Sequence, residues 1–222
     1  QLTQAFRTLD ATLTDIQNQS NVRLTDTVSD INTISSQIAA LNTEIARAVG
    51  RGQQPNDLLD TRDQLMDNLS KLVNFSYTTA ATGEVTISMG ATFGNIVDPT
   101  VVGGFNAIVR ADLDTMYANG EMTGGRALAD EQLWDPVGAP GSSGTGIIDT
   151  IRASLDTFVN TFVGAMNTAN GAGFDLNGVA GGNIFLAAGT TAATISIDPA
   201  NNILNNVNLI AAASSWGGAG EP

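Results

Sequence analysis

Residues 55–73, PNDLLDTRDQLMDNLSKLV, decide the fold of this chain, because their apolar residues recur at helical spacing. Steps of three or four residues place one apolar face along an amphipathic helix. The apolar positions are Leu58, Leu59, Leu65, Met66, Leu69, Leu72 and Val73. Asn56 is expected to cap this helix, and Asp57 to lie in its first turn, where the helix dipole favours a carboxylate.

Arg62 places a permanent positive charge on or beside that apolar face. An isolated charge is costly there, so we expect it to have a partner. A turn centred near residue 53 would pair two antiparallel helices so that Arg62 faces Glu44. We therefore predict that Arg62 forms an ion pair with Glu44, or bonds to a nearby backbone carbonyl, and so fixes the register of the two helices. The alternative is an arginine whose stem covers the apolar face while its head stays in water.

A long helix is predicted to precede this segment, over residues 1–49. Apolar residues step by three or four from Leu2 to Ile16, and the stripe resumes from Leu24 to Ile45 after a polar patch. Gly50 and the glycine two residues later should end this helix. Residues 24–73 are then expected to form a helical hairpin. The same pattern also fits a self-associating coiled coil, which stays open beside a helix that packs within its own bundle.

The pattern changes at residue 74, since only two of the 24 glycines precede residue 83. The runs NFSYTT, TGEVTISMG and FNAIVRADL favour strands, and Thr82-Gly83 favours a hairpin turn between the first two. Residues 124–146 read as a loop region with a short helix, and apolar residues at helical spacing predict a third long helix after it. The expected fold is α+β: a long-helix bundle, made of a helical hairpin and a third helix, with an attached glycine-rich antiparallel β portion.

Four segments follow from these patterns. Residues 1–73 form the long helix and hairpin of a helical domain, and residues 74–146 a β-rich segment with loops. Residues 147–169 add the third helix of the helical domain. Residues 170–222 are rich in strands and turns, with β-like runs NIFLA and ATISI and a helical turn expected in NLIAAASS.

The composition excludes several kinds of partner, catalytic site and metal site. The formal net charge is −13, with nine basic residues, no histidine and no cysteine. Nucleic acid is an unsuitable partner for such an acidic chain. Without histidine or cysteine there is no Ser-His triad, no thiolate metal site and no HExxH site. Residues 176–197 are uncharged but too rich in glycine, asparagine and threonine for a membrane-spanning helix. We expect no enzyme activity, no cofactor and no membrane insertion.

Carboxylates offer the remaining metal candidates. Asp175 lies in GAGFDL, which matches part of a calcium-binding GGxGxD repeat, but a single copy favours an ordinary turn. The acidic residues of the 55–73 helix are expected to form a solvated face. We therefore expect no metal site. Trp134 and Trp216 are interpreted as plugs in local loop clusters, with a subunit contact as the alternative.

One family shares these motifs. The segment IAALNTEIARAVGRGQQPNDLLDTRDQLMDNLSKLVNFSYTTAATGEVTISMG resembles the flagellar hook-associated protein 1 family, whose mark is a helix end, a glycine-containing loop and NDLLDxRDxLLxxLS. The matching motif residues are Asn56, Asp57, Leu58, Leu59, Asp60, Arg62 and Asp63. The segments TGGRALA (123–129) and residues 158–185 are also similar to the family, although a histidine common in relatives is absent.

The resemblance implies a structural component of the bacterial flagellum, an adaptor at the hook–filament junction on which filament assembly depends. It implies extracellular location, with export through the flagellar secretion channel and no cleaved signal. The implied partners are other axial proteins (the hook protein and a second junction protein) and copies of itself. The start at Gln1 is typical of a central fragment, which we expect to be monomeric alone. The alternative function is an extracellular adhesin-like binding module.

Overall fold

The computed structural model describes residues 1–134, 146–187, 190–201 and 203–215. The chain divides into two compact units. One unit contains residues 16–149, and the other contains residues 1–15 and 150–222. The four segments expected from the sequence group residues by type of element, whereas these units join segments that are distant in the chain.

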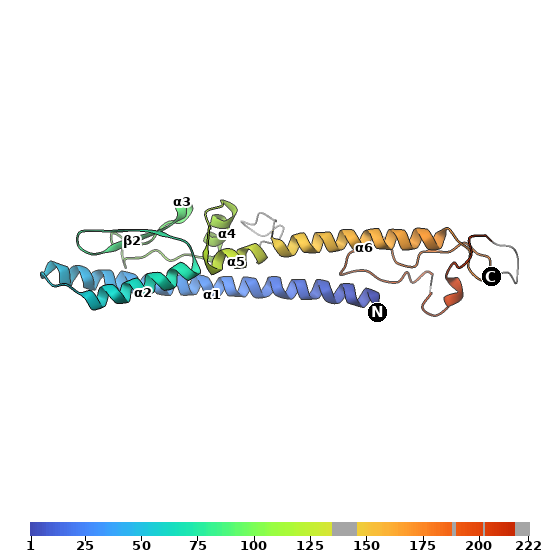
Figure 1. Cartoon of the computed structure of the whole chain (residues 1–222), viewed down its shortest axis with the longest axis horizontal. Coiled ribbons are helices and arrows are strands. Elements are labelled where there is room, and N and C mark those ends of the chain that lie inside the picture. Colours follow the sequence, from blue (N-terminus) through green and yellow to red (C-terminus); the bar gives the residue numbers. More distant parts are fainter. Residues whose placement is uncertain (135–145, 188–189, 202, 216–222) are drawn as a thin grey trace. The chain divides into compact units, whose positions relative to one another are not determined.

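The predicted helical hairpin is confirmed in the unit of residues 16–149. Helix α1 (Leu2–Gly50) runs unbroken into the tip, and α2 (Asn56–Leu72) returns beside its C-terminal part (Figure 1). Gly52 has a φ of 75°, a conformation that glycine adopts without steric cost, and its N–H donates to the carbonyl of Val49 at the helix end. The two glycines thus do what the sequence predicts: they stop one helix and start the turn.

A three-stranded antiparallel sheet follows, in the order β1 (Ser76–Thr79), β2 (Val85–Met89) and β3 (Gly94–Val97). A short helix, α3 (Gly90–Phe93), joins the last two strands. The first two strands are the predicted hairpin. Strand β2 alternates buried and half-buried residues because one face of the sheet covers the core.

The third predicted strand, FNAIVRADL, is wrong. Only Phe105 bridges to a strand residue, Val97, and α4 (Arg110–Ala118) begins inside the run. The carboxylate of Asp112 accepts a hydrogen bond from the N–H of Val109, which starts a helix where the apolar pattern favoured a strand. Helix α5 (Gly125–Trp134) is the short helix expected after it.

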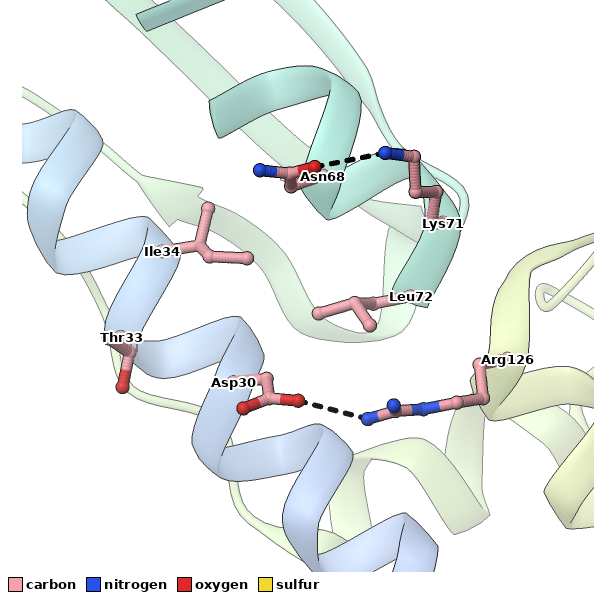
Figure 2. Close-up of a pocket in the computed structure, with 7 residues that line it drawn as sticks. All are labelled: Asp30, Thr33, Ile34, Asn68, Lys71, Leu72 and Arg126. Atoms are coloured by element: carbon pink, nitrogen blue, oxygen red, sulfur yellow. Dashed lines mark hydrogen bonds and ion pairs between the residues drawn. The ribbon is translucent and has the colours of Figure 1, made fainter. Parts of the chain in front are cut away.

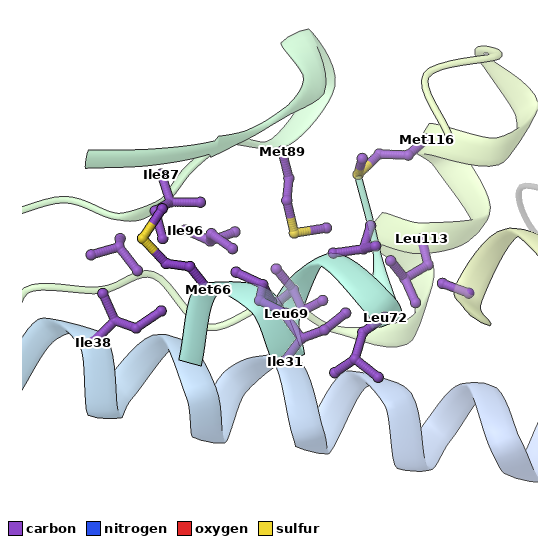
Figure 3. Close-up of a cluster of buried hydrophobic side chains, with 14 of the residues drawn as sticks. Ile31, Ile38, Met66, Leu69, Leu72, Ile87, Met89, Ile96, Leu113 and Met116 are labelled. Carbon is purple, nitrogen blue, oxygen red and sulfur yellow. The ribbon is translucent and has the colours of Figure 1, made fainter. Parts of the chain in front are cut away.

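The core of this unit lies between α1, α2, the sheet and α4 (Figure 3). It contains fully buried side chains from each of these elements, including Ile31, Ile38, Leu69, Ile87, Met89, Ile96, Leu113 and Met116. The start of α5 packs directly against the backbone at the end of α2. A side chain on Gly125 would approach the carbonyl oxygen of Leu72 to 2.5 Å, and the φ of Gly125 is 87°, so only glycine fits.

Two asparagine side chains of α1 bind backbone groups of the sheet and of the loop before α4. The amide of Asn42 in α1 donates to the carbonyl of Val85 and accepts from its N–H, at 2.7 and 3.0 Å. Asn32 makes the same pair of bonds with Ile108. Each amide thereby replaces a strand neighbour for one backbone residue, and the register of sheet and loop against α1 is set.

The other unit is built on α6 (Ile147–Gly171), which confirms the predicted third helix. Its residues Val159 and Val163 pack with Phe185 and Ile195, and Phe6 of α1 joins the cluster. The NIFLA and ATISI runs meet through a single antiparallel bridge between Phe185 and Ile197. A short 3₁₀ helix, η1 (Val207–Leu209), replaces the helical turn expected in NLIAAASS. No described helix has an apolar run long enough to cross a bilayer.

Candidate functional site

The sequence motif from Asn56 to Asp63 occupies the first two turns of α2. Asn56 is the first helical residue rather than the cap, which corrects the sequence-based expectation. Pro55 precedes it, and its carbonyl accepts hydrogen bonds from the N–H groups of Leu58 and Leu59, both at 3.1 Å. The proline ring carries no acceptor atom, so no side-chain cap forms, and this carbonyl binds the first N–H groups of α2. Asp57 lies in the first turn, as expected.

Arg62 is buried, with 9% of its side chain exposed. Its Nη1 donates to the carbonyl oxygen of Gly83 at 2.6 Å, and its Nη2 lies 3.4 Å from Oδ1 of Asp63. Its Nε has no described partner. The buried position excludes a head held in water, and the strong bond goes to a backbone carbonyl, which is one of the two partners considered for Arg62.

The predicted ion pair with Glu44 is not formed, and this corrects the first choice of partner. Glu44 is exposed on α1. The β1–β2 turn lies over the α1–α2 pair instead, because Gly83 sits against Ile45 and Val49 of α1. Arg62 therefore joins α2 to the β-hairpin, and not α2 to α1.

Gly83 itself is restricted to glycine. Its φ is 86°, and an added Cβ would lie 2.8 Å from Cγ2 of Ile45. Gly83 and Arg62 thus act together: because Gly83 has no side chain, the turn approaches α1 closely enough for the Gly83 carbonyl to accept from Arg62.

Four aspartates of α2 lie on its exposed surface: Asp57, Asp60, Asp63 and Asp67. The described part of the chain contains no group of three or more carboxylates arranged to hold a metal ion. Asp175, in the other unit, accepts hydrogen bonds from the N–H groups of Asn177 and Val179 at 2.8 Å, and from the side chain of Asn177 at 3.1 Å. These donors, the Val179 N–H foremost, lower the pKa of Asp175 and close a local turn.

Sequence reasoning missed a pair of buried carboxylates on α5. Oδ1 of Asp130 accepts from Nε of Arg23 at 2.7 Å and from the Ser20 hydroxyl at 3.1 Å, both on α1. Glu131 points in a different direction, to the guanidinium of Arg110 on α4. Because adjacent residues of a helix point about 100° apart, α5 is attached to two different helices.

Glu131 shares the guanidinium of Arg110 with a second carboxylate. Arg110 also bonds Asp114, four residues further along α4. The side chain of Glu131 is 1% exposed. Burial raises the pKa of Glu131 to about 7, against the attraction of Arg110 and with a further increase from Asp114. The hint in the sequence is that two acids stand next to each other in a short helix that also carries small and apolar residues.

Two grooves lie beside α2. The larger, about 380 Å³, opens between α1, α2 and α5 (Figure 2). Ile34 and Leu72 point into it, and two cations lie at its side: Arg126, 3.0 Å from Asp30, and Lys71, 3.0 Å from Asn68. The smaller, about 260 Å³, lies between α2 and β1. Among the residues that line these two grooves there is no serine or threonine beside a histidine, and their polar groups are carboxylates, amides, hydroxyls and the two cations.

Trp134 ends α5 and packs, half-buried, against the core of its unit; this burial is local, as expected, but in a core of helices and sheet and not in a loop cluster. Its backbone carbonyl accepts from the amide of Gln17 at 3.0 Å. Trp216 lies outside the described residues.

The comparisons with known proteins agree with one another. Residues 1–185 match the family model described as the flagellar hook-associated protein FlgK helical domain. Flagellar hook-associated protein 1 of Escherichia coli (strain K12) is 34% identical over 196 residues, which cover 83% of this chain and 35% of that protein. The protein of the same name from Bacillus subtilis (strain 168) is 27% identical over 207 residues, covering 82% of this chain and 41% of that protein. The chain therefore spans well under half the length of these relatives.

The fold also has a solved counterpart. The flagellar hook junction protein FlgK from Burkholderia pseudomallei superposes with a TM-score of 0.59 at 22% identity, over 83% of this chain and 34% of that one. At that identity the likeness concerns the fold. Since the helical-domain model covers residues 1–185 of the 222, this chain belongs to the FlgK family of flagellar hook-associated proteins.

Proposed function

We propose that the protein carrying this chain is a structural component of the bacterial flagellum, an adaptor at the hook–filament junction on which filament assembly depends. The observation that carries the proposal is the family match over residues 1–185, which contain both the α1–α2 hairpin and α6. The relatives are named as hook-associated or hook junction proteins. The chain would act outside the cell, after export through the flagellar channel without a cleaved signal.

The architecture suits a load-bearing role without catalysis. Helix α1 has 49 residues, and buried polar bonds attach other segments to it at several points. Contacts fixed by hydrogen bonds resist sliding better than a stripe of leucines does, because a shift leaves buried polar groups unpaired. The partners we propose are the hook protein, a second junction protein and copies of the same protein.

Electron microscopy of a strain that lacks the full-length gene tests this proposal. We expect hooks without filaments, with filament protein released into the medium, and recovery of filaments when the intact gene is returned. Normal filaments together with altered attachment to surfaces would overturn the adaptor role and support the adhesin-like alternative.

A further inference from the structure

We propose that the outer edge of β1, together with the groove between β1 and α2, binds an extended segment of another protein that carries a lysine or arginine. The inference goes beyond the junction role and does not depend on it. It rests on four features of this surface: an open strand edge, the absence of proline, charge or a bulge in that edge, exposed aromatic area, and two exposed carboxylates. Among the described residues, only one of these carboxylates, Asp63, has a cation near it, Arg62 at 3.4 Å.

The backbone of β1 is open on one side. Strand β1 is the outermost strand of the sheet, and all four of its residues are exposed. The N–H of Ala80 donates to the carbonyl of Glu84 at 2.8 Å, just beyond the paired strands. Hydrogen-bonded pairs alternate along an antiparallel ladder, so Ser76 and Thr78 face β2. Tyr77 and Thr79 therefore turn their N–H and C=O groups away from β2, where a further strand would pair.

Apart from its short length, this edge lacks the features that usually prevent strand addition. Proteins protect exposed edges with very short strands, proline, lysine or a bulge. Strand β1 reads SYTT, without charge or proline, and its pairing with β2 is regular from Ser76 to Thr79. The irregularity of the sheet lies between β2 and β3, away from this edge. A four-residue edge is short, which limits the expected affinity but leaves two outward residues to pair.

Aromatic side chains lie beneath the same edge. Tyr77 is 57% exposed, and its ring centroid lies 6.5 Å from that of Phe75. Met66 of α2 and these two rings line the groove of about 260 Å³. An exposed tyrosine beside a cavity can cover the stem of a long side chain and attract a cation to its face.

The rim of the groove is acidic. Asp63 and Asp67 line it from successive turns of α2, together with Ser70. Both carboxylates are exposed, and no cation lines the groove. Arg62 reaches Asp63 only at 3.4 Å from its buried position, where its closer bond goes to Gly83. The charge left at the rim favours a lysine or arginine held between the carboxylates and Tyr77.

A second copy of this chain fits poorly. Pairing β1 with β1 of another copy would bring two acidic rims together, and like charges there oppose association. Of the nine basic residues, only Arg51 lies outside a helix. The occupant is therefore an extended, basic segment of a different protein.

The test uses the 222-residue chain, labelled with nitrogen-15, and an acetylated and amidated peptide, Thr-Val-Thr-Arg-Thr-Val-Thr. We expect saturable shifts of the Tyr77 and Thr79 amide signals in nuclear magnetic resonance, weakened by salt. Replacing the peptide arginine by glutamine should weaken binding about three- to tenfold. No saturation at millimolar peptide, or shifts confined to other regions, would overturn the proposal.

Matched variants separate this groove from general charge attraction. Asp63→Asn with Asp67→Asn should weaken binding about three- to tenfold, whereas Asp57→Asn with Asp60→Asn makes the same charge change on the same helix outside the groove and should change it less than about twofold. Thr79→Pro removes an outward N–H and keeps the bonds of Thr78 to β2, so it should abolish the shifts. Equal effects of the two aspartate pairs, or full binding by Thr79→Pro, would contradict the proposal.

Discussion

Arg62→Met tests the hydrogen bond that joins α2 to the β1–β2 hairpin. Methionine keeps an unbranched apolar stem in the interior and removes the guanidinium. The lost bond to Gly83 is charge-assisted, 2.6 Å long and made by a side chain that is 9% exposed. Such bonds contribute about 1.5–3 kcal/mol. Methionine avoids the cost of burying a charge, and Gly83 is half-buried, so water can replace part of the bond. We expect a net loss of about 1–2 kcal/mol in the free energy of unfolding.

The matched control is Glu44→Gln. Glu44 is exposed, so its change should stay within about 0.5 kcal/mol. Urea unfolding followed by far-ultraviolet circular dichroism measures both variants. Amide exchange supplies a local readout: the N–H of Gly83, bonded to Ala80 at 2.9 Å, should exchange faster in Arg62→Met and at the parent rate in Glu44→Gln.

Two results would refute this reasoning. An Arg62→Met variant within about 0.5 kcal/mol of the parent would mean that the guanidinium contributes nothing net. An equal loss in Glu44→Gln, with strong coupling in the double variant, would make Glu44 the partner of Arg62 in solution.

Three further predictions concern other parts of the chain. The pKa of Glu131 is raised to about 7, so its protonated form stabilises the folded state fully below about pH 4.5, and this stability is lost as pH rises towards 7. Glu131→Gln should therefore reduce the change in the free energy of unfolding over that pH range by about 1–3 kcal/mol. An unchanged pH dependence would contradict the assignment. Asn42→Ala leaves the N–H and C=O of buried Val85 unpaired and should cost about 2–4 kcal/mol in urea unfolding, against less than about 1 kcal/mol for its neighbour Thr43→Ala. Sedimentation should show the isolated chain as a monomer at micromolar concentration, and a tight dimer there would restore the coiled-coil interpretation.

The helices were predictable because periodicity and glycine placement agree. The stripe up to Ile45, the stop at Gly50 and the apolar face of α2 all favour one structure, and the structure follows them. The β1–β2 hairpin was predictable for the same reason, since Thr82-Gly83 separates two β-branched runs. Local sequence patterns were enough to predict an element wherever periodicity, residue type and turn residues all favoured the same structure.

The errors arose where a polar contact decides the outcome, either a short-range cap or a bond to a distant segment. The run FNAIVRADL has strand-like residues, yet Asp112 caps the N–H of Val109 and a helix begins. The partner of Arg62 was misplaced because pairing across the turn considered only the two helices, whereas the β-hairpin brings Gly83 to the same place. Glu131 gave no periodic signal, because its role depends on Arg110, which lies 21 residues away.

The asparagines show what the sequence did contain. Asn42 lies four residues after Ile38 and three before Ile45, on the buried stripe of α1, and Asn167 lies four residues after Val163 on that of α6. Each amide bonds both the N–H and the C=O of a single residue, Val85 and Phe185 respectively. The rule that identifies Arg62, a polar residue on an apolar face, also identifies these two.

Such residues explain how long helices keep their register. A shift of α1 by one turn moves it about 5.4 Å and can place one isoleucine where another was, at little cost in buried area. The same shift carries the amide of Asn42 out of reach of Val85, whose N–H and C=O then stay buried without partners. The apolar stripes of α1 and α2 therefore make the two helices pack. The polar residues on those stripes, Asn42 on α1 and Arg62 on α2 among them, select the one position at which the backbone groups they contact are hydrogen-bonded.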